Sequence, residues 1–289
     1  MSITEQWDRA RMKIRRWING VHWTLSTSSG INRYIARHLH LDGYYWLFLL
    51  GVNNSGTTLL TRMLESHPQI RSLPHEGQRY TRALAKPGQF GAVRLWGTQM
   101  EAFRLTETDA PDIARRCRFD WAHAYEHRPG VILEKSPPNT VRSRWLQAHF
   151  RPCRFIAIVR NPYAVCQGIR RRQGHDIEAA ATHWARSNGC LLDDLPRLER
   201  AQLITYEALC DEPERTLDQI NRLLSLESPL DAGVFGKQYD VHNINDEAQP
   251  IRNLNDHAIS QLSGQEIDQI DAIVGDVARK FGYEKPAPA

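Results

Sequence analysis

Short apolar runs alternate along the chain with longer segments in which apolar residues recur every three or four positions. Four runs have the length and nearly continuous hydrophobicity of strands covered on both faces: 44–52, 131–134, 154–159 and 201–205. Helical periodicity fills the segments that follow, at about 138–149, 162–172, 177–194 and 213–225. Ser263, with Glu266 three residues later, has the capping-box pattern that starts a last helix, which we expect to end near Phe281. The alternation predicts an α/β fold with a parallel sheet.

The length of 289 residues, of which 41% are apolar, fits one large α/β domain with an ordinary core. We expect this domain over 44–283, after a helical N-terminal extension (1–43) and before a short tail (284–289). Residues 67–130 are rich in His, Arg, Trp and turn residues and interrupt the alternation of strands and helices. This segment is predicted to be a helical insertion.

The stretch YYWLFLLGVNNSGTTLL, residues 44–60, has the pattern of a phosphate-binding loop. An apolar strand stops at Gly51, and a polar turn leads directly into a helix, whose N-terminal N–H groups and dipole attract an anion. Gly56 lets the backbone fold closely around that anion. The lysine of nucleotide hydrolases is replaced here by Thr57, which argues against an ordinary ATPase or GTPase. The alternative is a glycine-rich turn that binds nothing.

Arg160 directly follows the predicted strand 154–159, and Asn161-Pro162 is a favourable helix start. Ligands of open α/β sheets bind beyond the carboxyl ends of the strands. We therefore expect Arg160 to meet the same ligand as the loop that begins at Gly51. The alternative is a surface arginine at a strand end.

Taken together, these motifs resemble the sulfotransferases that use 3′-phosphoadenosine 5′-phosphosulfate (PAPS), including the bacterial members and the protein-tyrosine branch. The resemblance rests on five segments in the family's order: the lysine-free loop ending in SGTTLL, VILEKSPPNT (131–140), the strand-Arg-x-Pro-helix around Arg160, LITYEALCDEPERTLDQINRLLSL (203–226) and PIRNLNDHAISQLSGQEIDQI (250–270). They span most of residues 44–283. The resemblance implies a P-loop-type three-layer fold with a central parallel sheet.

The resemblance also implies site residues. In the family, the first loop holds the 5′-phosphosulfate, the Arg-x-Pro motif holds the 3′-phosphate, and the lysine of E-K-x-P, here Lys135, lies near the transferring sulfuryl group. The implied donor-binding residues are Asn53, Asn54, Ser55, Gly56, Thr57, Thr58, Arg160, Gly168, Tyr206, Arg252 and Asn253. PAPS is the expected donor and 3′,5′-bisphosphate (PAP) the product, with no metal. The insertion 67–130 is the expected acceptor-binding region.

Two positions depart from the family pattern. Many relatives carry Arg or Lys directly before S-G-T-T, where this chain has Asn54, and the family's serine eight residues after the Arg-x-Pro arginine falls at Gly168. One cation and one hydroxyl are therefore missing. Three following arginines are candidates to compensate: Arg170, Arg171 and Arg172.

Glu76 is the candidate general base, because ESHPQIRSLPHEGQR (65–79) resembles the helix, H-P turn, strand and glutamate of the protein-tyrosine branch. A carboxylate beside the acceptor hydroxyl can accept its proton as the transition state forms. His75 is the alternative base and has the more suitable intrinsic pKa. Since neighbours on a strand point to opposite faces, we expect only one of the two to face the acceptor.

Composition restricts the partners. Lys+Arg 37 against Asp+Glu 33 gives a formal charge of +4, which suits an anionic ligand without the dense basic face of a nucleic-acid binder.

The basic N-terminal run with Trp7 and Trp17 is interpreted as a helix packed by its tryptophans, the alternative being contact with a membrane surface. No apolar run reaches the ~20 residues of a membrane span, so a cytoplasmic protein is expected. Five scattered cysteines without a C-x-x-C predict free thiols.

Two other kinds of protein stay open. One is a P-loop kinase, which the absent loop lysine and the absence of a clear magnesium-binding aspartate disfavour. The other is a non-catalytic nucleotide-binding relative, which Asn54 and Gly168 make conceivable. The acceptor is equally open among a tyrosyl peptide, a saccharide and a small hydroxylated metabolite, because neither fold nor motif selects among them. The sequence does not indicate an oligomeric state.

Overall fold

The computed structural model describes residues 44–73, 75–122, 130–231 and 251–287, together with scattered N-terminal positions, Gly233 and Gly236. The predicted N-terminal extension (1–43) otherwise falls outside the described residues. Two of the described positions there are Trp7 and Trp17, whose side chains are each 65% exposed. The prediction that these tryptophans pack a helix face is therefore wrong.

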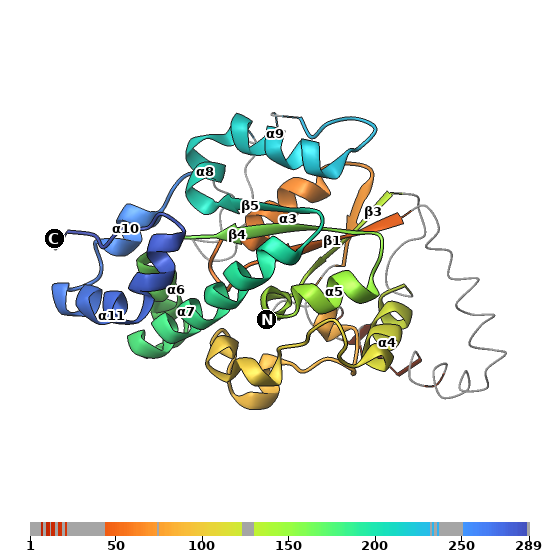
Figure 1. Cartoon of the computed structure of the whole chain (residues 1–289), viewed down its shortest axis with the longest axis horizontal. Helices are drawn as coiled ribbons and strands as arrows, with labels where there is room; N and C mark the ends of the chain where they lie inside the picture. Colours follow the sequence, from red (N-terminus) through yellow and green to blue (C-terminus); the bar gives the residue numbers. More distant parts are fainter. Residues whose placement is uncertain are drawn as a thin grey trace.

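A five-stranded parallel sheet lies at the centre of the molecule, in the order β2-β3-β1-β4-β5 (Figure 1). The strands are β1 (Tyr44–Leu50), β2 (Ile70–Ser72), β3 (Gly130–Lys135), β4 (Cys153–Val159) and β5 (Ala201–Thr205). The four strands predicted from apolar runs are confirmed. The short edge strand β2 is the strand that the resemblance placed after the H-P turn.

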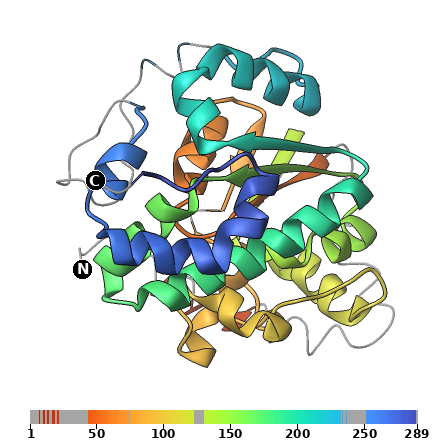
Figure 2. The same ribbon diagram turned by 60° about the vertical axis from the view of Figure 1, so that its left-hand side comes forward.

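Helices cover both faces of this sheet, and the side chains of β1 alternate between two cores. Leu47 and Leu49 pack against one set of helices: α3 (Thr57–Glu65), α8 (Tyr206–Asp211) and α9 (Pro213–Leu224). Trp46 and Phe48 face the other set: α4 (Pro111–Ala122), α5 (Ser143–His149), α6 (Pro162–Gln173), α7 (Ile177–Asp194) and α11 (Gly264–Lys280). Figure 2 shows α11 lying alongside α6 and α7. The predicted α/β fold with a central parallel sheet is confirmed.

The helix ends follow from local chemistry. The Asn161 side chain accepts hydrogen bonds from the N–H groups of Tyr163 and Ala164, with Pro162 in the first turn of α6. The capping box predicted at the start of α11 is also present. The single helix predicted over 138–149 is wrong, because the segment forms a 3₁₀ turn, η4 (Pro137–Val141), before α5. Its two prolines lack the N–H groups of a regular helix.

The interrupted segment after β2 forms short helical turns: η1 (Gly77–Arg79), η2 (Pro87–Phe90) and η3 (Trp96–Ala102). They precede α4, and η3 packs beside η4 and α7. Two further short elements complete the described fold: η5 (Leu195–Arg197) and α10 (Asn255–Ile259). All five strands of the sheet are parallel, so their carboxyl ends meet at one edge, which is where polar loops gather.

Candidate active site

A cleft of about 900 Å³ opens at the carboxyl edge of the sheet. Thirteen predicted site residues line it: Asn53, Asn54, Gly56, Thr57, Thr58, His75, Glu76, Lys135, Arg160, Gly168, Tyr206, Arg252 and Asn253. Its described lining also contains eight Lys and Arg residues (Arg62, Arg79, Arg94, Lys135, Arg160, Arg171, Arg172, Arg252) against three carboxylates (Glu65, Glu76, Asp256). This excess of positive charge suits a polyanionic ligand.

The loop between β1 and α3 is built around two glycines. A Cβ at Gly51 would lie 2.7 Å from the carbonyl oxygen of Ile158, and Gly56 has a left-handed φ of 91°. The Gly51 N–H donates to Thr140 Oγ1 at 2.8 Å, which holds the loop against η4. No side chain caps the start of α3, whose first turn faces the cleft with Thr57 and Thr58. The loop therefore offers backbone and hydroxyl donors to an anion.

Ser55 is the one predicted site residue that does not line the cleft. Its side chain is fully buried, its hydroxyl has no hydrogen-bond partner among the described residues, and its N–H donates to the Val52 carbonyl at 3.2 Å. In this structure Ser55 shapes the turn, and its hydroxyl does not reach the cleft. The prediction of a Ser55 contact with the ligand finds no support in this geometry.

Arg160 is fixed at the end of β4 before any ligand binds. Its Nε donates to Asn255 Oδ1 at 2.8 Å, one terminal nitrogen donates to the Asn54 carbonyl at 3.1 Å, and its guanidinium lies 4.0 Å above the ring of Tyr206. Burial lowers the pKa of Arg160, and Tyr206 and Glu207 oppose that effect. An arginine with such a high intrinsic pKa remains a cation and is preorganised for an anion.

Glu207 is a supporting residue that sequence reasoning missed. Its carboxylate accepts hydrogen bonds from the N–H of Asn161, from the Asn255 side chain and from the Tyr283 hydroxyl. It therefore joins the start of α6 to the C-terminal segment that borders the cleft. Its place in the Y-E-x-L segment was the available signal, since Tyr206 in the same segment supports Arg160.

The C-terminal segment closes one side of the cleft. The carbonyl of Arg252 accepts a hydrogen bond from the Tyr206 hydroxyl at 2.9 Å. Asn253 donates to Asp211 at 2.8 Å and accepts from the N–H of Asn255, so its side chain orders the turn. Arg252 and Asn253, both predicted as site residues, border the cleft. The side chain of Asn253 already has hydrogen-bond partners within the protein.

The two departures from the family pattern lie side by side. A Cβ at Gly168 would lie 3.2 Å from Nδ2 of Asn54. The Asn54 amide thus occupies space that a serine side chain at position 168 would need. Of the arginines predicted to compensate, Arg171 and Arg172 line the cleft, whereas Arg170 pairs with Glu266 and does not.

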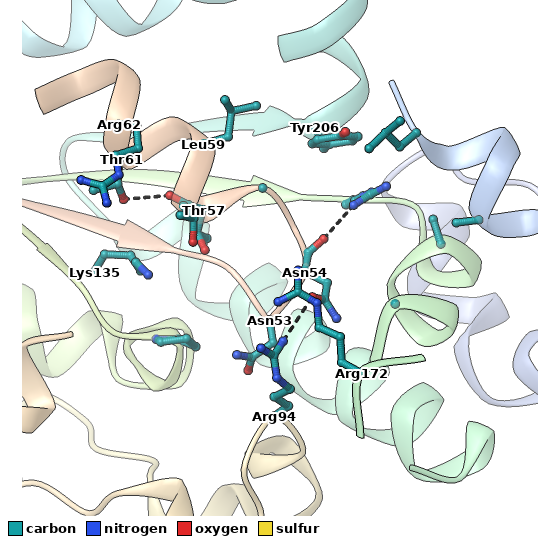
Figure 3. Close-up of a pocket in the computed structure, with 18 of the residues that line it drawn as sticks. Asn53, Asn54, Thr57, Leu59, Thr61, Arg62, Arg94, Lys135, Arg172 and Tyr206 are labelled. Carbon is teal, nitrogen blue, oxygen red and sulfur yellow. Dashed lines mark hydrogen bonds between the residues drawn. The ribbon is translucent and has the colours of Figure 1, made fainter. Parts of the chain in front are cut away.

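Lys135 is the last residue of β3 and lies opposite Leu49 of β1 in the parallel register. This places it one strand away from the loop, and its side chain lines the cleft on the side of Thr57 (Figure 3). The first turn of α3 and the ammonium group therefore face the same volume.

His75 and Glu76 both line the cleft, and which of the two faces the acceptor stays a prediction. Strand β2 ends at Ser72, so the alternation of a strand does not govern these residues. The Glu76 carboxylate accepts a hydrogen bond from Gln78 Nε2 at 2.6 Å and lies 3.9 Å from Nε of Arg79. Glu76 is thus oriented by its own turn.

Glu134, the residue before Lys135, clamps that turn to the end of β3. Its fully buried carboxylate accepts hydrogen bonds from the Gly77 N–H at 2.7 Å, from Ser136 Oγ at 2.6 Å and from Asn139. Burial raises the pKa of Glu134, while these donors and the nearby Arg142 lower it. A Cβ at residue 77 would lie 2.5 Å from Glu134 Oε1, so this contact requires glycine. Glu134 thereby positions Glu76 and Lys135 relative to each other.

The described residues contain no group of three or more His, Cys, Asp or Glu side chains that could hold a metal ion. They also contain no helix long and apolar enough to cross a bilayer. The five cysteines are unpaired, as predicted.

The fold and the cleft define an α/β protein with a cation-lined cleft at the carboxyl edge of its sheet, and comparison with known proteins identifies its family. The model described as the Sulfotransferase family matches residues 47–230, more than half of the chain. The chain belongs to the Sulfotransferase family and is a transferase.

Individual relatives are distant. The chain is 22% identical over 269 residues to protein-tyrosine sulfotransferase A of Caenorhabditis elegans, covering 85% of this chain and 70% of the relative. Its structure is similar to the sulfotransferase domain from the Synechococcus PCC 7002 olefin synthase, with a TM-score of 0.57, 23% identity, and coverage of 84% of this chain and 96% of that one. Sulfotransferase STF9 from Mycobacterium avium gives a TM-score of 0.53 at 14% identity, covering 87% and 81% of the two chains. These structures support the fold.

Proposed function

We propose that this enzyme transfers a sulfuryl group from PAPS to an acceptor hydroxyl or phenol. The observation that carries the proposal is the cleft itself, in which the glycine loop, Arg160, Lys135 and the carboxylate of Glu76 face one volume. Eight cationic side chains against three carboxylates suit a donor with a 3′-phosphate and a 5′-phosphosulfate. The loop and Arg160 lie beyond neighbouring strand ends, where two such groups could be held apart.

In this proposal the first turn of α3, with Thr57 and Thr58, binds the 5′-phosphosulfate, and Arg160 binds the 3′-phosphate. Tyr206, Arg252 and the Asn253 turn border the nucleotide. Gly168 of α6 and Asn54 of the loop contact each other. The donor supplies an activated sulfuryl group, and no metal ligand is needed in this scheme.

Two side chains would carry the chemistry. Glu76 accepts the acceptor's proton as its oxygen approaches sulfur, and His75 is the alternative base on the same side of the cleft. Lys135 offsets the negative charge that develops on the bridging oxygen as its bond to sulfur breaks. Preorganisation by Glu134 keeps both groups in place, and position with electrostatics does most of the work.

The acceptor would enter from the insertion 67–130, within a domain that we place at 44–283. A second pocket of about 290 Å³ adjoins the cleft there and shares Glu76 with it. A tyrosyl peptide is the first candidate because one relative is a protein-tyrosine sulfotransferase. A saccharide and a small hydroxylated metabolite are the alternatives.

A screen with labelled PAPS tests this proposal. A tyrosyl peptide, a monosaccharide and 4-nitrophenol would be the three acceptors, and we expect transfer to at least one without magnesium. PAP should stabilise the fold without magnesium as well. Phosphate transfer from ATP with magnesium would instead support the kinase, and binding of PAP without any turnover would support a non-catalytic relative.

Arg160→Ala is expected to weaken PAP binding by about 2 kcal/mol, the loss of one charge-assisted phosphate contact. Binding of 5′-AMP should change far less, because that nucleotide has no 3′-phosphate. Isothermal titration with both nucleotides measures the difference. Equal losses for the two nucleotides would show that Arg160 does not recognise the 3′-phosphate.

A further inference from the structure

Arg94, a residue of the insertion with no place in any of the five motifs, lies where the donor cleft meets the second pocket. Both are lined by Arg94, Glu76, Asn53, Arg79 and Pro137. If the proposed function holds, this shared wall is where a sulfuryl group passes from donor to acceptor.

The turn that carries Arg94 is attached to the loop at two consecutive residues. A terminal nitrogen of Arg94 donates to Asn54 Oδ1 at 3.3 Å (Figure 3), and Trp96 Nε1 donates to Asn53 Oδ1 at 3.1 Å. Trp96 is fully buried. The Gly97 N–H donates to Nδ1 of His183 at 2.9 Å, and burial lowers the pKa of that histidine to about 3, so it stays a neutral acceptor. Since His183 belongs to α7, this hydrogen bond anchors the turn to that helix.

The backbone of Arg94 adopts a strained conformation. Its φ is 67°, in the left-handed region that a non-glycine residue rarely occupies. Asn54, its partner, also has a φ of 67°. Strain of this kind persists where surrounding structure fixes it, and it gathers at functional sites.

The contact also fixes the orientation of the Asn54 amide. An arginine only donates hydrogen bonds, so the atom facing Arg94 must be the oxygen. Nδ2 then points toward Gly168, where it is buried without a hydrogen-bond partner among the described residues. Asparagine is uncharged, so the loop has no cation at position 54. Arg94 is the cation that contacts this position.

Arg94 has no carboxylate within ion-pair distance in the part of the chain that the structure describes. Burial lowers the pKa of Arg94, and the nearby charge of Glu76 partly opposes that effect. Arg172 is a neighbouring cation: burial lowers its pKa, and the charge of Arg94 lowers it further. Arg94, a partly buried cation without an ion-paired carboxylate among the described residues, therefore offers a site for an anionic group.

We propose that Arg94 is a catalytic residue that replaces, from the insertion, the cation missing from the loop at Asn54, and that it binds the sulfuryl group during transfer. In this step the acceptor oxygen forms a bond to sulfur, and the bond from sulfur to the phosphate oxygen breaks. The bonding pair leaves with the phosphate, and the acceptor's proton goes to the general base. Arg94 remains protonated and donates hydrogen bonds to the sulfuryl oxygens.

Arg94→Ala tests this proposal with labelled PAPS and the best of the three acceptors. We expect kcat to fall about 30- to 100-fold, because a transition-state contact is lost. The affinity for PAP, which has no sulfuryl group, should stay within about threefold of wild type. Arg94→Lys should keep more activity than Arg94→Ala, and Arg115→Ala, an exposed arginine paired with Asp112 outside the cleft, should match wild type.

Restoring the charge gives a readout that a purely structural role would not show. Asn54→Arg combined with Arg94→Ala returns a cation to the loop, and added guanidinium ion can replace the lost side chain of Arg94→Ala. Recovery of kcat by about tenfold in either experiment supports the proposal. Unchanged kcat in Arg94→Ala, an equal loss of PAP affinity, or recovery in neither experiment would overturn it. A wild-type enzyme that transfers nothing from PAPS would overturn the proposed function as well.

Discussion

Lys135→Ala is expected to lower kcat about 10²-fold or more while the affinity for PAP stays nearly unchanged. Negative charge builds on the bridging oxygen only as its bond to sulfur breaks, so an ammonium group there acts mainly in the transition state. Lys135 lies at the end of β3, beside the loop and facing the first turn of α3. Steady-state turnover with labelled PAPS, together with titration of PAP, separates the two effects.

Lys135→Arg is the matched variant, because it keeps the charge but changes its reach. Its kcat should lie between those of wild type and Lys135→Ala. The melting temperature of each variant shows whether the fold is intact. Near wild-type turnover in Lys135→Ala would mean that the E-K-x-P segment does not have the role that the family resemblance implies.

The sheet and the loop were accessible to sequence reasoning because their causes are local. Continuous apolar runs gave the strands, and the capping pattern at Ser263 and the Asn161-Pro162 start gave helix ends. Parallel strands share one carboxyl edge, so the sequence alone predicts that Arg160 and the loop converge there. Both do line one cleft.

Contacts between distant segments were not accessible in the same way. Nothing local to Arg94 indicates that a buried Trp96, bonded to Asn53, and a neutral His183 hold its turn against the loop. The link between Asn54 and Gly168 is likewise a matter of packing between the loop and α6. Two departures that looked independent along the sequence are one contact in space.

The expectation that only one of His75 and Glu76 faces the acceptor rested on the alternation of a strand. A two-residue periodicity applies only while the backbone stays extended, and β2 ends at Ser72. Beyond it, the path of the chain is set by the Glu134 carboxylate, which holds the N–H of Gly77. Both candidate bases line the cleft, and the choice between them is left to experiment.

Glu76→Gln is expected to lower turnover about 10²- to 10⁴-fold while PAP and PAPS still stabilise the fold. Glutamine keeps the size of the side chain and some of its hydrogen bonding, but it cannot accept the acceptor's proton. The existing contact with Gln78 Nε2 can be kept by the amide oxygen, so the turn should remain in place. Turnover with each of the three acceptors and thermal stability with PAP measure the two halves of this expectation.

His75→Ala is the matched control, since its side chain borders the same cleft one residue earlier. We expect it to keep most of the activity. If His75→Ala is inactive and Glu76→Gln remains active, the two roles are reversed, and the likeness to the protein-tyrosine branch loses its main support. If both variants are active with 4-nitrophenol but Glu76→Gln fails with the tyrosyl peptide, the base matters only for the less acidic hydroxyl, because a phenol of low pKa is already ionised at neutral pH.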